Sequence, residues 1–135
     1  TPSVQGAADQ AERLNQERKP AEGLALIKSV QWKAWTKGDK LIVLSQLAGT
    51  SLALDRDADA IKYYRQMEAL QGTTLANDLN LAEIGEKIGD KDLAIKEYQQ
   101  AIVDLKKLPE SDIQQITPEG LQEHIDALQH PEAQP

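Results

Sequence analysis

Apolar residues recur along this chain at spacings of three and four positions, the period of an amphipathic helix. Long runs that alternate apolar and polar residues, as half-buried strands do, are absent, so the pattern predicts an all-α protein. The expected helices run from Ala7 to Glu17, from Pro20 to Trp35, over 41–54, from Asp57 to the turn at Gly72, over 75–88, and over 91–108.

Capping residues and glycines suggest where these helices begin and end. Gly38-Asp39 is expected to end the second helix, Asp57 to cap the fourth, and Gly89-Asp90 to stop the fifth. Thr117-Pro118-Glu119 has the order of an N-cap, a proline at the first helical position and an acid in the first turn. This order predicts a last helix, whose apolar stripe would be Leu121, Ile125 and Leu128.

The run from Leu41 to Leu54 carries no charge. It is shorter than the roughly 20 apolar residues that span a bilayer, and it contains Ser45 and Thr50. We therefore expect no membrane insertion and interpret the run as a central helix that is buried on most sides.

An internal repeat joins the later helices. When the segment 41–74 is laid over the segment 75–108, the matching positions are mostly apolar or small. The identities are Leu41/Leu75, Leu47/Leu81, Ala48/Ala82, Ala60/Ala94, Ile61/Ile95, Lys62/Lys96, Tyr64/Tyr98 and Gln66/Gln100. A helix–turn–helix unit of about 34 residues is the signature of tetratricopeptide repeats, and the chain resembles that family.

The resemblance implies a right-handed α-α superhelix in one domain over 1–135. It would hold about three helical hairpins, a degenerate one at 4–37 and two clearer ones at 41–74 and 75–108, with a capping segment at 109–130. Small residues followed by an aromatic, as in Ala60 with Tyr64, would let paired helices approach closely. Ser51, Asp78 and Gly85 are poor versions of positions that are bulky in the family. The alternative is a plain helical bundle that contains a duplication.

The resemblance also implies a binding surface, because the first helix of each repeat in this family lines a concave groove that holds extended peptides. Carried over to this chain, the groove would have an apolar centre and polar flanks. Its residues would be Glu12, Gln16, Ile42, Ser45, Gln46, Gly49, Leu52, Leu79, Asn80, Glu83, Glu86 and Lys87. Family members that clamp a peptide's terminal carboxylate use basic side chains here. The matching residues are Ala8, Glu12, Gln46, Ala76 and Asn80, so no such clamp is expected.

Charge and composition narrow the function. The chain has 135 residues, a net charge of -7 and no cysteine. An acidic chain repels phosphate backbones, so nucleic acid is not an expected partner. His124 and His130 lie too far apart for a metal motif on one helical turn, and no Gly-rich phosphate loop or nucleophile elbow is present. We therefore expect no enzyme, no catalytic or metal-binding residue and no cofactor.

The function predicted from the sequence is a scaffold that binds a peptide or helix of another protein in the groove. The alternative is a structural module that forms a homodimer or larger homo-oligomer through Leu121 and Leu128, or through an exposed Trp32 or Trp35. The chain begins with Thr1-Pro2, from which we expect a trimmed or processed mature chain without a signal peptide. Such a chain fits the cytoplasm or a bacterial periplasmic or secreted setting.

Overall fold

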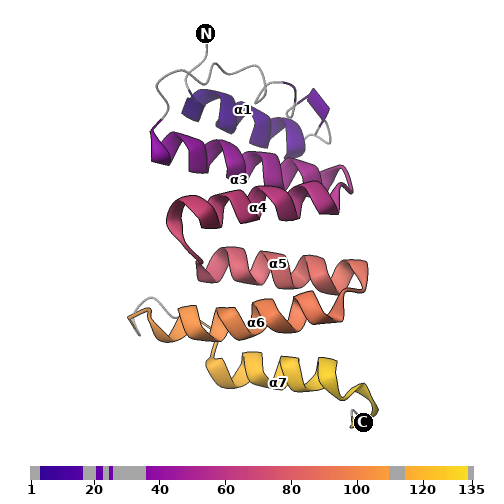
Figure 1. Ribbon diagram of the computed structural model, residues 1–135. Helices are drawn as coiled ribbons and strands as arrows, with labels where there is room; N and C mark the ends of the chain where they lie inside the picture. The colour runs from indigo at the N-terminus through magenta and orange to yellow at the C-terminus, as the bar shows by residue number, and fades with distance from the viewer. Residues whose placement is uncertain (1–3, 17–20, 23–24, 26–35, 110–114, 134–135) are drawn as a thin grey trace. The chain divides into compact units, whose positions relative to one another are not determined.

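The computed structural model describes residues 4–16, 21–22, 25, 36–109 and 115–133. Within these residues the protein is all-α, as predicted, with no β-strand. The helices (Figure 1) are α1 Val4–Gln16, α3 Lys37–Ala53, α4 Asp57–Gln71, α5 Leu75–Ile88, α6 Lys91–Lys106 and α7 Pro118–Gln129, followed by the short 3-10 helix η2 Pro131–Ala133. The predicted helix from Pro20 to Trp35, with both tryptophans, falls almost wholly outside the described residues.

The chain divides into two compact units, Thr1–Gly72 and Thr73–Pro135. In the first unit α3 packs against both α1 and α4. In the second unit α6 packs against both α5 and α7. Each unit is therefore built around one helix that contacts two others.

Alanines bring α1 and α3 together in the first unit. Ala7, Ala8 and Ala11 lie on one face of α1 and are buried against Val43 and Leu47 of α3. Methyl side chains keep the two helix backbones close, because they occupy little of the space between them. Half-buried Ile42, Leu54 and Tyr63 complete this cluster.

Helix α3 begins four positions before the uncharged run. The Thr36 hydroxyl accepts a hydrogen bond from the Asp39 N–H at 3.0 Å, and the Asp39 carboxylate accepts one from the Thr36 N–H at 3.3 Å. This reciprocal capping box starts a helix. The prediction that Gly38-Asp39 ends the preceding helix is therefore wrong, because both residues belong to the first turn of α3.

The start of α4 also differs from the prediction. Arg56 is the N-cap and makes no side-chain capping bond, whereas Asp57 is the first residue inside the helix. There the Asp57 carboxylate still lies beside the positive end of the helix dipole. Along α3 itself, buried residues alternate with an exposed line made of Ser45, Gly49 and Ala53.

The second unit follows the predicted pattern more closely. Helix α5 has the expected bounds and ends at Gly89, which adopts the left-handed conformation (φ 78°) that favours glycine. The Asp90 carboxylate then caps α6 by accepting a hydrogen bond from the Leu93 N–H at 3.0 Å.

Gly85 sets the distance between α5 and α6. A β-carbon at this position would lie 2.7 Å from the backbone nitrogen of Ala94 and 3.1 Å from the Asp90 carbonyl oxygen. Atoms at such distances overlap, so only glycine allows the two backbones to approach this closely. The interpretation of Gly85 as a poor bulky residue missed this role, because the position needs the absence of a side chain.

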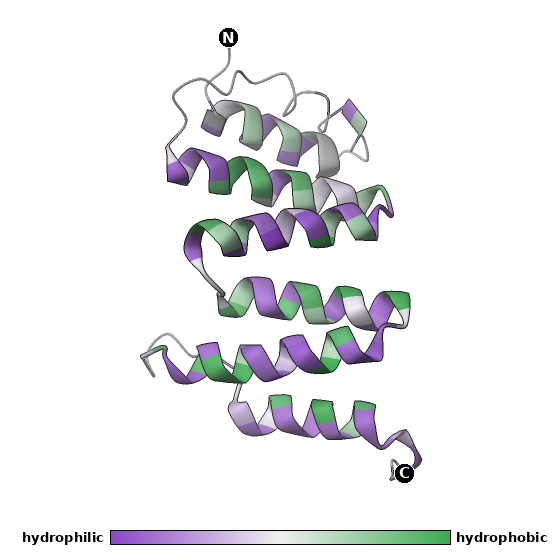
Figure 2. Ribbon diagram, in the orientation of Figure 1, coloured by the Kyte–Doolittle hydropathy of each residue, from purple (hydrophilic) through white to green (hydrophobic). Residues whose placement is uncertain are grey.

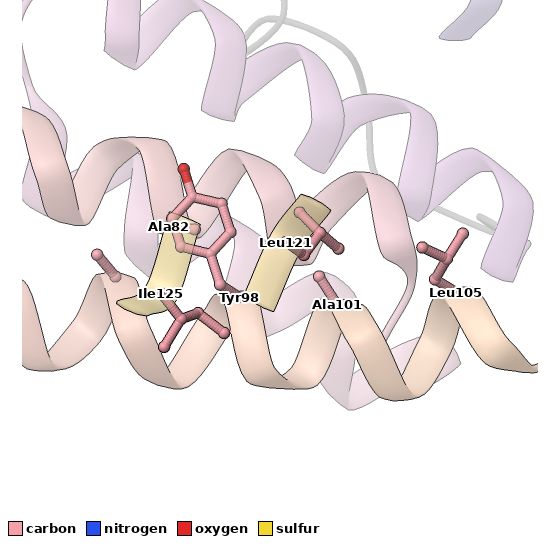
Figure 3. Packing of buried hydrophobic residues seen from close by; sticks show 7 residues of the cluster. Ala82, Tyr98, Ala101, Leu105, Leu121 and Ile125 are labelled. Carbon is pink, nitrogen blue, oxygen red and sulfur yellow. The ribbon is translucent and has the colours of Figure 1, made fainter. Parts of the chain in front are cut away.

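Helix α7 closes the second unit. The Thr117 hydroxyl accepts a hydrogen bond from the Gly120 N–H, and Pro118 occupies the first turn, as predicted. The apolar residues of α7 lie along the edge that faces α6 (Figure 2). Leu121 and Ile125 are buried beside Tyr98 (Figure 3), and Leu128 is half-buried, which confirms the predicted stripe.

Gly85→Ala should lower the stability of the protein, because the new methyl group must push α6 away from α5. We expect a loss of about 1–3 kcal/mol, the usual cost of overpacking a filled interior. Gly49→Ala is the matched control, since a β-carbon there has no described neighbour within 4 Å. That variant should gain up to about 1 kcal/mol from helix propensity. Thermal unfolding followed by circular dichroism measures both, and a loss of equal size in the two variants would contradict the close approach at Gly85.

Candidate functional site

A groove of about 350 Å³ lies between α1 and α3 in the first unit. Its described lining comes from two faces of neighbouring helices. The residues are Gln5, Ala8, Asp9 and Glu12 of α1 and Leu41, Ile42, Ser45 and Gln46 of α3. On each helix these residues are either adjacent or separated by about one helical turn, so each set forms one continuous face.

The floor of the groove is apolar and its edges are polar. Ala8 is buried, and Leu41 and Ile42 are half-buried. Asp9 and Glu12 are exposed on the α1 side, and Ser45 is exposed on the α3 side. An apolar floor with a few polar groups around it is the usual composition of a site that binds by shape and is oriented by hydrogen bonds.

Four of the predicted groove residues meet here. Glu12, Ile42, Ser45 and Gln46 line the groove together. Gly49 and Leu52 follow Ile42 at helical spacing on α3, but they lie beyond the lining. Gln16 is the last residue of α1, and its side chain is outside the described part of the structure.

Gln5, Asp9 and Leu41 line the groove but were not predicted as groove residues. The expected first helix began at Ala7, whereas α1 begins at Val4 and brings Gln5 into its first turn. The Gln5 Nε2 donates a hydrogen bond to Asp9 Oδ1 at 2.8 Å. Counting back from Glu12 by one and two helical turns would have found Asp9 and Gln5, because they lie three and seven positions earlier in the sequence.

The described lining carries two carboxylates, those of Asp9 and Glu12, and no lysine or arginine. Arg13 is next to Glu12 in the sequence, but its guanidinium donates a hydrogen bond to Gln10 Oε1. Lys40 precedes Leu41, but it lines a different depression, between α3 and α4. The groove therefore presents negative charge along its α1 edge.

The depression between α3 and α4 is larger, about 460 Å³, and differs in character. Leu44, Leu47, Tyr63, Ala69 and Leu70 line it together with Lys40 and Gln66. Leu44 and Leu47 are core residues of the first unit, so this surface continues the core. None of the predicted groove residues lines it, and we take the groove between α1 and α3 as the candidate site.

The remaining predicted residues belong to α5 in the second unit. Leu79 is half-buried and packs against the core of that unit, and Asn80 is also half-buried. Glu83, Glu86 and Lys87 are exposed. Of these, Glu86 has a further role that the sequence reasoning missed.

Glu86 ties together the three helices of the second unit. Its carboxylate accepts a hydrogen bond from the Tyr98 hydroxyl of α6 at 2.5 Å. The Nε2 atom of His124, on α7, lies 3.1 Å from both carboxylate oxygens. The Tyr98 and His124 rings meet edge to face, with centroids 4.8 Å apart. His124 is therefore placed to hold α7 on the pair formed by α5 and α6.

The pKa values of this junction follow from its geometry. Burial opposes ionisation of Glu86, but the hydrogen bonds from Tyr98 and His124 outweigh burial and lower the pKa of Glu86 below its ordinary value of 4.5. Burial and the Glu86 carboxylate raise the pKa of Tyr98 above its ordinary value of 10.0. Tyr98 is therefore a hydrogen-bond donor to an ionised Glu86 at neutral pH.

Two acids on the packed helices α5 and α6 are buried in the same unit. Asp78 of α5 is fully buried, and Asp104 of α6 accepts a hydrogen bond from Gln100 Nε2 at 3.4 Å. The Lys107 ammonium lies 3.7 Å from Asp104 Oδ1. Burial opposes ionisation of Asp104, but hydrogen bonds from Thr73 and Gln100 and the charge of Lys107 help to lower its pKa below the ordinary value. Asp78 thus places a carboxylate in the interior of the second unit, at a position that is bulky in the repeat family.

Among the described residues, no helix is both long and apolar enough to cross a membrane. Comparison of the chain with models of known protein families, with curated proteins and with solved structures finds no match.

Glu86→Ala should destabilise the second unit by about 1–2 kcal/mol at neutral pH, because it removes hydrogen bonds to a charged acceptor. The folded-state pKa of Glu86 is depressed, so this stabilisation is present above about pH 4.5 and is lost as the pH falls through the lower folded-state value. The difference in unfolding free energy between wild type and variant should therefore shrink in acid.

Chemical denaturation at several pH values between neutral and strongly acidic measures this difference. Glu123→Gln is the control, since Glu123 is an exposed carboxylate on α7. A stability difference for Glu86→Ala that stays constant across this pH range would show that the Glu86 charge does not hold α7.

Proposed function

We propose that the chain is a tetratricopeptide-like repeat protein that binds a peptide or helix of a partner protein in the groove between α1 and α3. The observation that carries this proposal is the meeting of Glu12, Ile42, Ser45 and Gln46 around one groove. The resemblance to the repeat family alone predicted these residues as groove residues, because they match the binding face of the first helix in each repeat.

Features of the helix pairs support the repeat assignment. Helix α5 and helix α6 keep to the repeat period, and they approach at small residues, Gly85 and Ala94. Helix α1 contacts α3, as two first helices of successive repeats would. This order of contacts is the one that stacked helical hairpins produce, because each repeat contacts its neighbours.

The shape and chemistry of the groove suit a polypeptide segment. The half-buried Leu41 and Ile42 offer aliphatic contact to a side chain of the partner. The amides of Gln5 and Gln46 and the hydroxyl of Ser45 offer hydrogen bonds to a backbone. An extended peptide presents side chains and free backbone groups along one line, and a helix presents an apolar face with polar side chains beside it, so either form fits a groove that follows two helices.

The surface of α7 that was predicted to support self-association is occupied by contacts within the second unit. Leu121 is buried against α6, and Leu128 is half-buried beside it, so the stripe of α7 serves the core of the second unit. A homodimer remains a prediction. Light scattering over a range of protein concentrations tests it, since a mass that stays at the monomer value removes it.

A selection of random peptides, displayed on phage, against the full chain tests the binding proposal. Ser45→Arg should weaken the selected peptides by about tenfold or more, because a long charged side chain fills the groove. Gln71→Arg adds the same charge to an exposed position at the end of α4, outside the groove, and should bind as the wild type does. Fluorescence anisotropy with labelled peptides gives the dissociation constants.

Circular dichroism should show the same helix content for both arginine variants and for the wild type. Peptides that bind Ser45→Arg and Gln71→Arg equally well would place the binding surface elsewhere and contradict the proposal. An additional variant, Gly49→Arg, measures how far along α3 the contact extends, because Gly49 lies one turn beyond Ser45 and is exposed.

A further inference from the structure

We infer that the groove between α1 and α3 recognises a basic amphipathic segment, in which an aliphatic side chain contacts the floor and lysine or arginine side chains face Asp9 and Glu12. This inference rests on the proposed function and adds the chemical class of the partner. It follows from how charge is distributed over the walls of the groove.

The two walls of the groove differ in charge. Asp9 and Glu12 lie three positions apart on α1, so their carboxylates stand one above the other along the same edge. The α3 wall offers a hydroxyl and an amide, from Ser45 and Gln46, and its described lining has no charge. A bound segment therefore meets negative charge on one side, which favours basic side chains on one face of that segment.

The described cations that are nearest in the sequence do not neutralise this edge. The Arg13 guanidinium hydrogen-bonds to Gln10, and the Lys40 side chain lines the depression on the other side of α3. Gln5 donates one hydrogen bond to Asp9, but an amide carries no charge and leaves the second carboxylate oxygen for a partner. Both carboxylates can therefore pair with basic side chains of a ligand.

The floor limits the choice further. Ala8 is buried and small, and Leu41 and Ile42 are half-buried, so the space above them suits an aliphatic side chain. A purely basic peptide would leave this floor in contact with water, and a purely apolar one would leave the carboxylates without partners. The net charge of -7 attracts a positive segment at longer range and repels an acidic one.

The peptides selected on phage test this inference through their composition. We expect the enriched sequences to carry a net positive charge and at least one leucine, isoleucine or valine between the basic residues. Their affinity should fall as the salt concentration rises from about 50 to 500 mM, because salt screens exposed charge pairs.

Charge removal tests the inference directly. The double variant Asp9→Asn/Glu12→Gln should weaken the enriched peptides by about three- to tenfold at low salt, the size expected of two exposed ion pairs. The matched control Asp59→Asn/Glu123→Gln removes the same two charges at exposed positions outside the groove, so its affinity should stay within about twofold of the wild type.

The outcomes separate this inference from the proposed function. The basic-segment inference would be overturned if the enriched peptides were neutral or acidic. It would also be overturned if the peptides bound the two double variants equally. In either case, loss of binding to Ser45→Arg would leave the groove as the binding site. Peptides that ignore Ser45→Arg contradict the proposed function itself. A selection that yields no binding peptide contradicts both.

Discussion

The close approach of α5 and α6 at Gly85 is the constraint on which the second unit depends. Because no side chain separates Gly85 from the Ala94 backbone, the two helices pack at a short distance and bury Ala82, Ala94 and Ala101 between them. The same approach brings the Tyr98 hydroxyl within hydrogen-bonding reach of Glu86, and that carboxylate in turn reaches His124. The position of α7 therefore depends on a glycine in another helix. A change in the spacing of α5 and α6 would disturb the polar junction as well as the apolar core.

In the first unit, small residues have a different consequence, because there they shape the candidate site. Ala7 and Ala11 are buried where α1 meets α3, and the residues that flank this contact on α1 are left at the surface. Asp9 and Glu12 are exposed for that reason, and they face the opposite wall formed by Ser45 and Gln46. The groove is thus the margin of a helix contact, with a floor built from the same alanine and aliphatic residues that hold the helices together. A ligand that binds there extends the packing that already exists between α1 and α3.

The helical period and some of the caps were readable from the sequence, whereas the contacts between helices were not. The bounds of α5 and the stripe of α7 followed from helical spacing and from turn residues such as Gly89 and Thr117, which act locally. The start of α3 was missed because Gly38-Asp39 was interpreted as a helix end, whereas Asp39 forms a reciprocal capping box with Thr36. Gly85 was misjudged because its role lies in the neighbouring helix. Four residues of the groove were found from the family's binding face, but Gln5 was not, since it depended on where α1 begins.

Equivalent positions of the segments 41–74 and 75–108 show how the α3 face differs from the α5 face. Glu86 on α5 corresponds to Leu52 on α3, and Tyr98 corresponds to Tyr64. A leucine side chain has no oxygen to accept a hydrogen bond from a tyrosine, so position 52 cannot form the polar junction that Glu86 forms with Tyr98 and His124. On α5 this part of the face is used to hold α7 in place.

On α3 the same face begins with Ile42 and Ser45 in the groove. It continues through the exposed Gly49, where no described atom lies within 4 Å of an added β-carbon. Equivalent faces of the two segments are thus used differently: the α5 face holds α7, and the α3 face leaves Ser45 and Gly49 exposed.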